Sequence, residues 1–108
     1  MLSYTIIETE IMDMLKQYTQ EKKVYIAGNS VYTDVMFLRK HMPHIINWCH
    51  YRLLDISTLK IIKEVWHQNI LPFEKQKKHT ALSDIKESIA EFKYYKEKLF
   101  IIHHIIHQ

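Results

Sequence analysis

The sequence predicts a small α/β domain that is rich in helices and contains about two parallel strands. Two short apolar runs without polar alternation, residues 24–27 and 53–56, are typical of strands covered on both faces. Longer segments with an apolar residue at every third or fourth position surround these runs and indicate amphipathic helices. Strands that alternate with helices are usually parallel and joined by right-handed crossovers. A length of 108 residues with 47% apolar content fits one domain.

The first half of the chain predicts a helix, a strand and a second helix. Residues 5–18 carry apolar side chains at i, i+4, i+7, i+8 and i+11, which draw one stripe on a helix. After the first strand, Gly28 and Asn29 break the extended chain, and we expect Ser30 to cap a helix that runs to about His41, before Pro43. The predicted inward faces of the two helices are Ile7, Ile11, Met14, Leu15 and Tyr18, and Val31, Val35, Leu38 and Met42.

The second half predicts a strand and two further helices. We expect Ser57 to cap the helix after the second strand, residues 68–78 to form a loop, and Thr80 to open a long final helix. The predicted inward faces are Leu59, Ile62, Val65 and Trp66, and Ile85, Ile89, Phe92 and Leu99. Because two strands make a poor sheet, the pattern leaves a sheet edge without a partner and indicates that strands are missing.

Composition excludes several classes of protein. A single cysteine, Cys49, rules out an internal disulfide and fits a reducing compartment. No apolar run approaches the roughly 20 residues of a membrane helix, and the N-terminus lacks the features of a secretory signal. The net charge of +3 hints at an anionic partner. We therefore expect an intracellular protein, cytoplasmic or mitochondrial, that does not act in a membrane.

Polar residues follow each predicted strand, where functional groups of parallel α/β sheets gather. Asp34 lies one turn into the helix after the first strand, and Asp55 ends the second strand. His79 and Asp84 flank the start of the last helix with the spacing H-x-x-x-x-D. Each also has a simple structural explanation, since an aspartate in the first turn favours a helix electrostatically.

Three blocks of sequence resemble the oligoribonucleases, exonucleases of the histidine-bearing DEDD type. Residues 27–38 (AGNSVYTDVMFL), followed by Met42-Pro43, resemble the second exonuclease motif of this family. Residues 50–60 (HYRLLDISTLK) resemble its next signature block, and residues 79–88 (HTALSDIKES) its third motif. The resemblance implies the C-terminal portion of a ribonuclease H-like fold. It also implies a 3′→5′ exoribonuclease that degrades very short RNA to mononucleotides with two Mg²⁺ or Mn²⁺ ions per complete site.

Catalytic roles follow from the same resemblance. By matching position, Asp34 and Asp84 would be metal ligands, and carboxylate oxygens are what hard dications require. His79 would be the general base that activates the water, a task that suits a side chain whose ordinary pKa lies near neutrality.

Substrate contacts are implied as well. Ser30, Arg52 and Ser57 match positions around the terminal phosphate of a short RNA, where hydroxyl donors and a guanidinium fork are chemically suitable. Tyr51 matches a residue that the family contributes across a dimer interface. The implied partners are therefore short single-stranded RNA and a second copy of the chain.

The family's first motif, an Asp-x-Glu pair on the first strand, occurs nowhere in these 108 residues. We therefore expect residues 1–108 to form one partial exonuclease domain, with the second and third motifs and without the first. Two carboxylates hold two dications poorly, so little or no activity is expected of the chain alone. An unpaired strand edge also predicts self-association.

Two other interpretations stay open. In the first, the chain is a non-catalytic module that binds RNA or drives dimerisation through Arg52, the lysine-rich loop and the tyrosines. In the second, His103 and His107, spaced i and i+4 in the tail, chelate a transition metal. Packing of the isoleucine-rich tail explains the same pattern.

Overall fold

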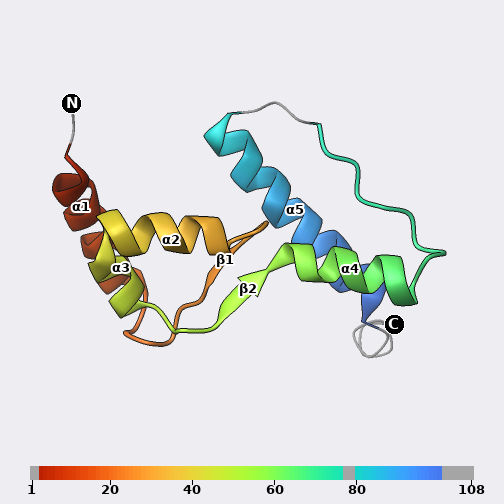
Figure 1. Ribbon diagram of the computed structural model, residues 1–108, viewed down its shortest axis with the longest axis horizontal. Coiled ribbons are helices and arrows are strands. Elements are labelled where there is room, and N and C mark those ends of the chain that lie inside the picture. Colours follow the sequence, from red (N-terminus) through yellow and green to blue (C-terminus); the bar gives the residue numbers. More distant parts are fainter. Residues whose placement is uncertain (1–2, 77–79, 101–108) are drawn as a thin grey trace. The chain divides into compact units, whose positions relative to one another are not determined.

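The computed structural model describes residues 3–76 and 80–100, and the chain divides into two compact units, residues 1–54 and residues 55–108 (Figure 1). The element order is α1 (Tyr4–Tyr18), β1 (Ile26–Gly28), α2 (Tyr32–His41), α3 (Pro43–Trp48), β2 (Leu53–Asp55), α4 (Ile56–Trp66) and α5 (Ala81–Leu99). The predicted helix-rich α/β class with two parallel strands is thereby confirmed.

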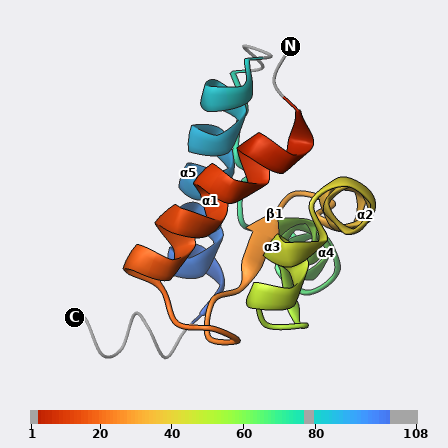
Figure 2. The same cartoon turned by 90° about the vertical axis from the view of Figure 1, so that its left-hand side faces the viewer.

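The first unit is built on three helices, of which α3 was not predicted. Pro43 ends α2 as expected, but it also occupies the first position of α3, where its missing N–H costs nothing. Figure 2 looks nearly along α2 and shows α3 following it directly. Both α1 and α2 pack against α3.

The core of the first unit consists of Met42, Ile45 and Cys49, with half-buried apolar side chains around them. The predicted inward face of α2 is correct, since Val31, Val35 and Met42 are buried and Leu38 is half-buried. On α1 the prediction is right for Ile7, Ile11 and Leu15, which pack on this core. It is wrong for Met14 and Tyr18, which are exposed, because α1 contacts its neighbours along a narrower stripe.

A buried acid connects two helices of the first unit. Glu8 on α1 accepts a hydrogen bond from the backbone N–H of His44 (2.8 Å) and contacts Nδ1 of that residue at 2.7 Å. At the other end of α1, the indole N–H of Trp48 donates to the hydroxyl of Thr19 (2.8 Å). These contacts tie α1 to both ends of α3.

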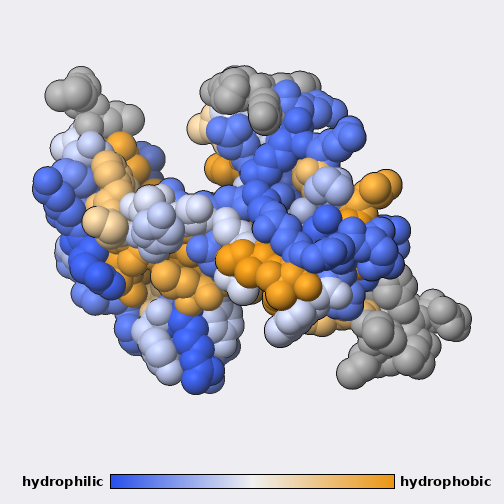
Figure 3. All heavy atoms as spheres, turned by 45° about the vertical axis from the view of Figure 1, so that its right-hand side comes forward, coloured by the Kyte–Doolittle hydropathy of each residue, from blue (hydrophilic) through white to orange (hydrophobic). Residues whose placement is uncertain are grey.

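The sheet consists of β1 and β2 alone among the described residues. The expectation that both strands are covered on both faces is wrong for this chain, because Ala27, Leu53 and Leu54 are exposed. A two-stranded sheet also leaves one edge of each strand without a described partner, as the sequence pattern indicated. Figure 3 shows apolar side chains on the surface of both units.

The second unit is a pair of helices closed by the segment that connects them. Leu59 on α4 packs with Tyr95 and Leu99 on α5, and Phe73 of the connecting segment joins the same cluster. The predicted inward faces are right for Leu59 and Leu99, which are buried, and for Ile62 and Phe92, which are half-buried. They are wrong for four residues that are exposed: Val65, Trp66, Ile85 and Ile89.

The buried stripe of α5 has a polar centre, which explains why an apolar pattern missed it. Glu91, with 1% of its surface exposed, lies one turn from Tyr95 and two turns from Leu99. Its carboxylate pairs with Lys60 of α4 (3.2 Å) and with Lys75 of the connecting segment (3.6 Å). A buried charge is tolerated only when it is paired in this way.

Residues 70–76 form a strap along α5. The hydroxyl of Tyr94 donates to the carbonyl of Leu71, and the hydroxyl of Tyr95 accepts from the N–H of Phe73 (3.3 Å). The N–H of Gln76 donates to Glu87 (3.1 Å). The strap has no regular secondary structure, and these side chains satisfy three of its backbone polar groups.

Candidate functional site

Ser30 and Asp34 stand at the start of α2, directly after β1. The expected capping role of Ser30 is wrong, because α2 begins at Tyr32 after an Ncap at Val31. Ser30 instead adopts a left-handed backbone (φ 51°), and its carbonyl accepts from the N–H (3.2 Å) and the hydroxyl (3.0 Å) of Thr33. The start of α2 therefore has no side-chain cap, and the Ser30 side chain is exposed at the end of the strand.

Asp34 lies in the first turn of α2 and is exposed. Within residues 3–76 and 80–100 its carboxylate makes no hydrogen bond or ion pair. It stabilises the helix electrostatically from this position and remains available to an external cation.

Tyr51 and Arg52 are brought together in the turn before β2, on a ladder of stacked groups. The ring centroids of Tyr25 and His50 are 4.8 Å apart, and those of His50 and Tyr51 are 4.7 Å apart with nearly parallel planes. The guanidinium carbon of Arg52 lies 5.5 Å from the Tyr51 centroid, within range of a cation–π interaction. The backbone N–H of Arg52 donates to Nδ1 of His50 (3.0 Å), which fixes the imidazole in the stack.

The ladder is exposed to solvent, since 78% of the surface of Tyr51 and about half of that of Tyr25 are accessible. Tyr25 and His50 were not singled out from the sequence. The signal that could have identified them is the pairing of the two predicted strands, because His50 N–H donates to the carbonyl of Val24 (2.8 Å) and so brings Tyr25 beside residues 50–52.

Ser57 lies in the first turn of α4, in the second unit. The expected cap is again shifted, because Asp55 is the Ncap and its carboxylate accepts from the N–H of Ser57 (3.0 Å). Asp55 thereby satisfies one of the free N–H groups at the helix start, a role that favours aspartate. The Ser57 hydroxyl is half-buried beside this terminus.

Asp84 lies in the first turn of α5 and is exposed. The predicted opening of this helix is confirmed, and it is a full capping box: Thr80 accepts from the N–H of Ser83 (3.2 Å), and Ser83 accepts from the N–H of Thr80 (3.3 Å). The Asp84 carboxylate makes no hydrogen bond or ion pair with the rest of the described chain. His79 lies outside the described residues, as do His103 and His107.

The implied dications can be tested against these donors. Asp34 and Asp84 offer exposed carboxylates without competing partners, which is the ligand type that Mg²⁺ and Mn²⁺ require. Residues 3–76 and 80–100 contain no group of three or more His, Cys, Asp or Glu side chains able to hold a metal. The described residues therefore fit the metals in type of ligand but do not form a complete metal site.

In the described part of the chain, no helix is both long enough and apolar enough to span a membrane.

Comparison with known proteins identifies the family. An exonuclease family model, that of RNase T, matches residues 5–92. The chain is 41% identical over 101 residues to an oligoribonuclease of Francisella tularensis subsp. tularensis, an alignment that covers 94% of this chain and 56% of the relative. It is 43% identical over 94 residues to a probable oligoribonuclease of Caenorhabditis elegans, covering 87% of this chain and 49% of the relative.

The chain thus spans about half the length of the curated relatives that it matches. Both relatives belong to the group that the three sequence blocks resemble, and the family match contains all three blocks. The resemblance to the oligoribonucleases that the sequence indicated is confirmed: the chain belongs to the RNase T family of exonucleases and is similar to the oligoribonucleases.

Proposed function

We propose that these residues form part of a 3′→5′ exoribonuclease that degrades very short RNA to mononucleotides. The observation that carries the proposal is the family match over residues 5–92, which includes both exposed aspartates at helix starts. The identity of more than 40% to two proteins named as oligoribonucleases supports the choice of RNA as substrate.

In this proposal Asp34 and Asp84 hold divalent metal, Mg²⁺ or Mn²⁺. When bound, the metal ions would polarise the scissile phosphate and lower the pKa of the attacking water. The free carboxylates of both aspartates support this role, and His79 is the proposed general base.

The terminal phosphate of the RNA is proposed to contact Ser30, Arg52 and Ser57. The exposed hydroxyl of Ser30 at the end of β1 and the guanidinium of Arg52 are donors of the kind that phosphate oxygens accept. Tyr51 is the proposed contact to a partner subunit, and its 78% exposure supports a role outside the core of its own unit.

The activity is tested with a 5′-labelled RNA dinucleotide in Mg²⁺ or Mn²⁺. Asp34→Asn in a chain extended through the Asp-x-Glu motif should lower the rate by at least 100-fold, because a metal ligand is lost. Asp13→Asn is the matched control, since Asp13 is an exposed helical aspartate outside the three blocks. Equal activity of the two variants would contradict the proposed role of Asp34.

The 108 residues alone are proposed to turn over RNA slowly or not at all, because two carboxylates cannot supply the ligands of two dications. Metal-dependent cleavage by this chain, lost in Asp34→Asn, would overturn that part of the proposal.

A homodimer is the proposed assembly state. The edges of β1 and β2 that pair with no described strand, together with exposed Leu53 and Leu54, support self-association at this sheet. Light scattering at micromolar concentration should give twice the mass of the chain, and Leu54→Lys should reduce it. A monomeric mass for the unchanged chain would refute the dimer.

The second candidate is a non-catalytic RNA-binding module, which the stacked ladder of Tyr25, His50, Tyr51 and Arg52 favours. Exposed aromatic rings beside a cation are the usual platform for bases of single-stranded RNA. RNA binding by the extended chain without any cleavage would select this function.

A further inference from the structure

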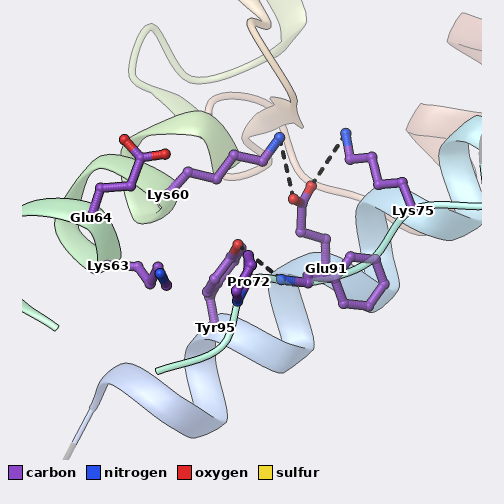
Figure 4. A pocket seen from close by; sticks show the side chains of 8 residues that line it. Lys60, Lys63, Glu64, Pro72, Lys75, Glu91 and Tyr95 are labelled. Carbon is purple, nitrogen blue, oxygen red and sulfur yellow. Dashed lines mark hydrogen bonds and ion pairs between the residues drawn. The ribbon is translucent and has the colours of Figure 1, made fainter. Parts of the chain in front are cut away.

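The second unit contains a pocket of about 300 Å³ that none of the candidate catalytic or RNA-contacting residues line (Figure 4). It lies between α4, the strap of residues 70–76 and α5, and it is lined in part by Lys60, Lys63, Lys75, Glu91 and Tyr95. This volume is at the lower end of small-molecule sites, so the pocket suits a ligand with few atoms.

The pocket carries an excess of positive charge. Three lysines and two glutamates line it, and the buried Glu91 pairs with the ammonium groups of Lys60 and Lys75. Lys63 adds a third ammonium group and forms no ion pair with any residue in the ranges that the structure describes. Glu64, the other acid of the lining, is exposed and extends from α4 on the side away from Glu91 (Figure 4).

A buried hydroxyl adds a neutral donor. The Tyr95 side chain has 2% of its surface exposed, and its oxygen accepts from the N–H of Phe73. A phenolic group can donate as well as accept. In the described chain no acceptor receives the Tyr95 proton, which is therefore available to a ligand in the pocket.

We infer that this pocket binds a phosphate group. Ammonium groups and a hydroxyl on one small cavity match a dianion with three strong acceptor oxygens better than they match a carboxylate with two. Figure 4 shows Lys60 and Lys75 reaching Glu91 from opposite sides, so the buried carboxylate holds both ammonium groups at the cavity. The phosphate is supplied by inorganic phosphate or by a mononucleotide. The inference does not depend on the proposed activity, since none of the residues proposed for metal binding, catalysis or contact with the RNA lines this pocket.

Isothermal titration calorimetry of the 108-residue chain tests the inference at constant ionic strength, with inorganic phosphate and with adenosine 5′-monophosphate as probes. Phosphate should bind, and Lys63→Met should weaken the binding at least fivefold. Lys93→Met is the matched control, because Lys93 is an exposed lysine of α5 that does not line the pocket, and it should leave the affinity unchanged.

Glu91→Gln gives an opposite prediction that distinguishes a phosphate site from general loss of structure. It keeps the shape of the side chain and removes the charge that neutralises Lys60 and Lys75, so phosphate should bind several-fold more tightly. If this variant fails to give a native circular dichroism spectrum, Tyr95→Phe replaces it and should weaken the binding.

Tighter binding of the mononucleotide than of phosphate identifies a nucleotide as ligand, and equal binding identifies the phosphate group alone. No heat of binding in the unchanged chain, or equal affinities in Lys63→Met and Lys93→Met, would overturn the inference.

Discussion

Glu8 Oε1 lies 2.7 Å from Nδ1 of His44, and the second oxygen of Glu8 accepts the backbone N–H of the same residue at 2.8 Å. Both bonds favour the ionised carboxylate, and the side-chain bond from His44 contributes most to a pKa of Glu8 below its ordinary value. One residue of α3 therefore holds α1 by two bonds that depend on the charge of a single acid.

The stability of the chain should depend on pH through Glu8. A lowered pKa in the folded state means that the ionised acid stabilises the fold above its ordinary pKa, which is near 4.5, and that this stabilisation is lost as the pH falls through the folded value. The urea concentration at the midpoint of unfolding should therefore fall as the pH is lowered from 7 to 3. Glu8→Gln should flatten the dependence, and an unchanged profile in Glu8→Gln would show that Glu8 is not responsible.

Cys49 should react slowly with thiol reagents. Its side chain is 4% exposed, and burial raises the pKa of the thiol, which reduces the population of the reactive thiolate. A colorimetric disulfide reagent should label the folded chain at least tenfold more slowly than the chain in urea. Equal rates would mean that the core formed by Met42, Ile45 and Cys49 opens readily.

Thr80→Ala should destabilise the second unit by about 1 kcal/mol, because the capping box of α5 loses the oxygen that accepts the Ser83 N–H. Thr58→Ala is the matched control, since Thr58 is an exposed residue within α4. Denaturant midpoints that shift equally in the two variants would contradict a capping role.

Gly28→Ala should fold normally, although Gly28 belongs to the AGNS string of the second motif. An added Cβ would lie 3.6 Å from Cγ2 of Val31, which is ordinary van der Waals contact, and the residue has no positive φ. The expected change in the free energy of unfolding is below about 1 kcal/mol and stabilising.

Ser30→Val, two residues away, should be destabilising by about 1–2 kcal/mol, because a β-branched side chain fits the left-handed region poorly. Thermal melts of the two variants give the comparison, and the reverse order of stability would refute it.

The sequence predicted helices better than the surfaces through which they pack. Periodicity located α1, α2, α4 and α5, but it missed α3, whose six residues are too few to show a helical repeat. Apolar spacing also placed Ile85 and Ile89 inward, whereas the buried stripe of α5 passes through Glu91. Its burial depends on Lys60 and Lys75, which no apolar pattern detects.

The sequence predicted where the candidate residues lie on the fold better than it predicted their local geometry. Position after a strand correctly located Asp34 in the first turn of α2, and position at the expected start of the last helix correctly located Asp84 in the first turn of α5. Propensity assigned capping to Ser30 and Ser57, but the left-handed turn at Ser30 moved one cap to Val31, and Asp55 replaced Ser57 at the other. Neighbouring serines and aspartates compete for the same N–H groups, so composition alone does not decide between them.

The strap of residues 70–76 has a consequence for how the chain meets proteases. A connection of this kind between two helices is normally the first place to be nicked, since a protease must draw several residues of extended backbone into its own active site. Here Tyr94, Tyr95 and Glu87 hold the backbone at Leu71, Phe73 and Gln76, so that cleavage within the strap first requires these bonds to open together. Glu74 and Lys75 thus mark sites that a protease recognises in sequence but reaches only after local unfolding.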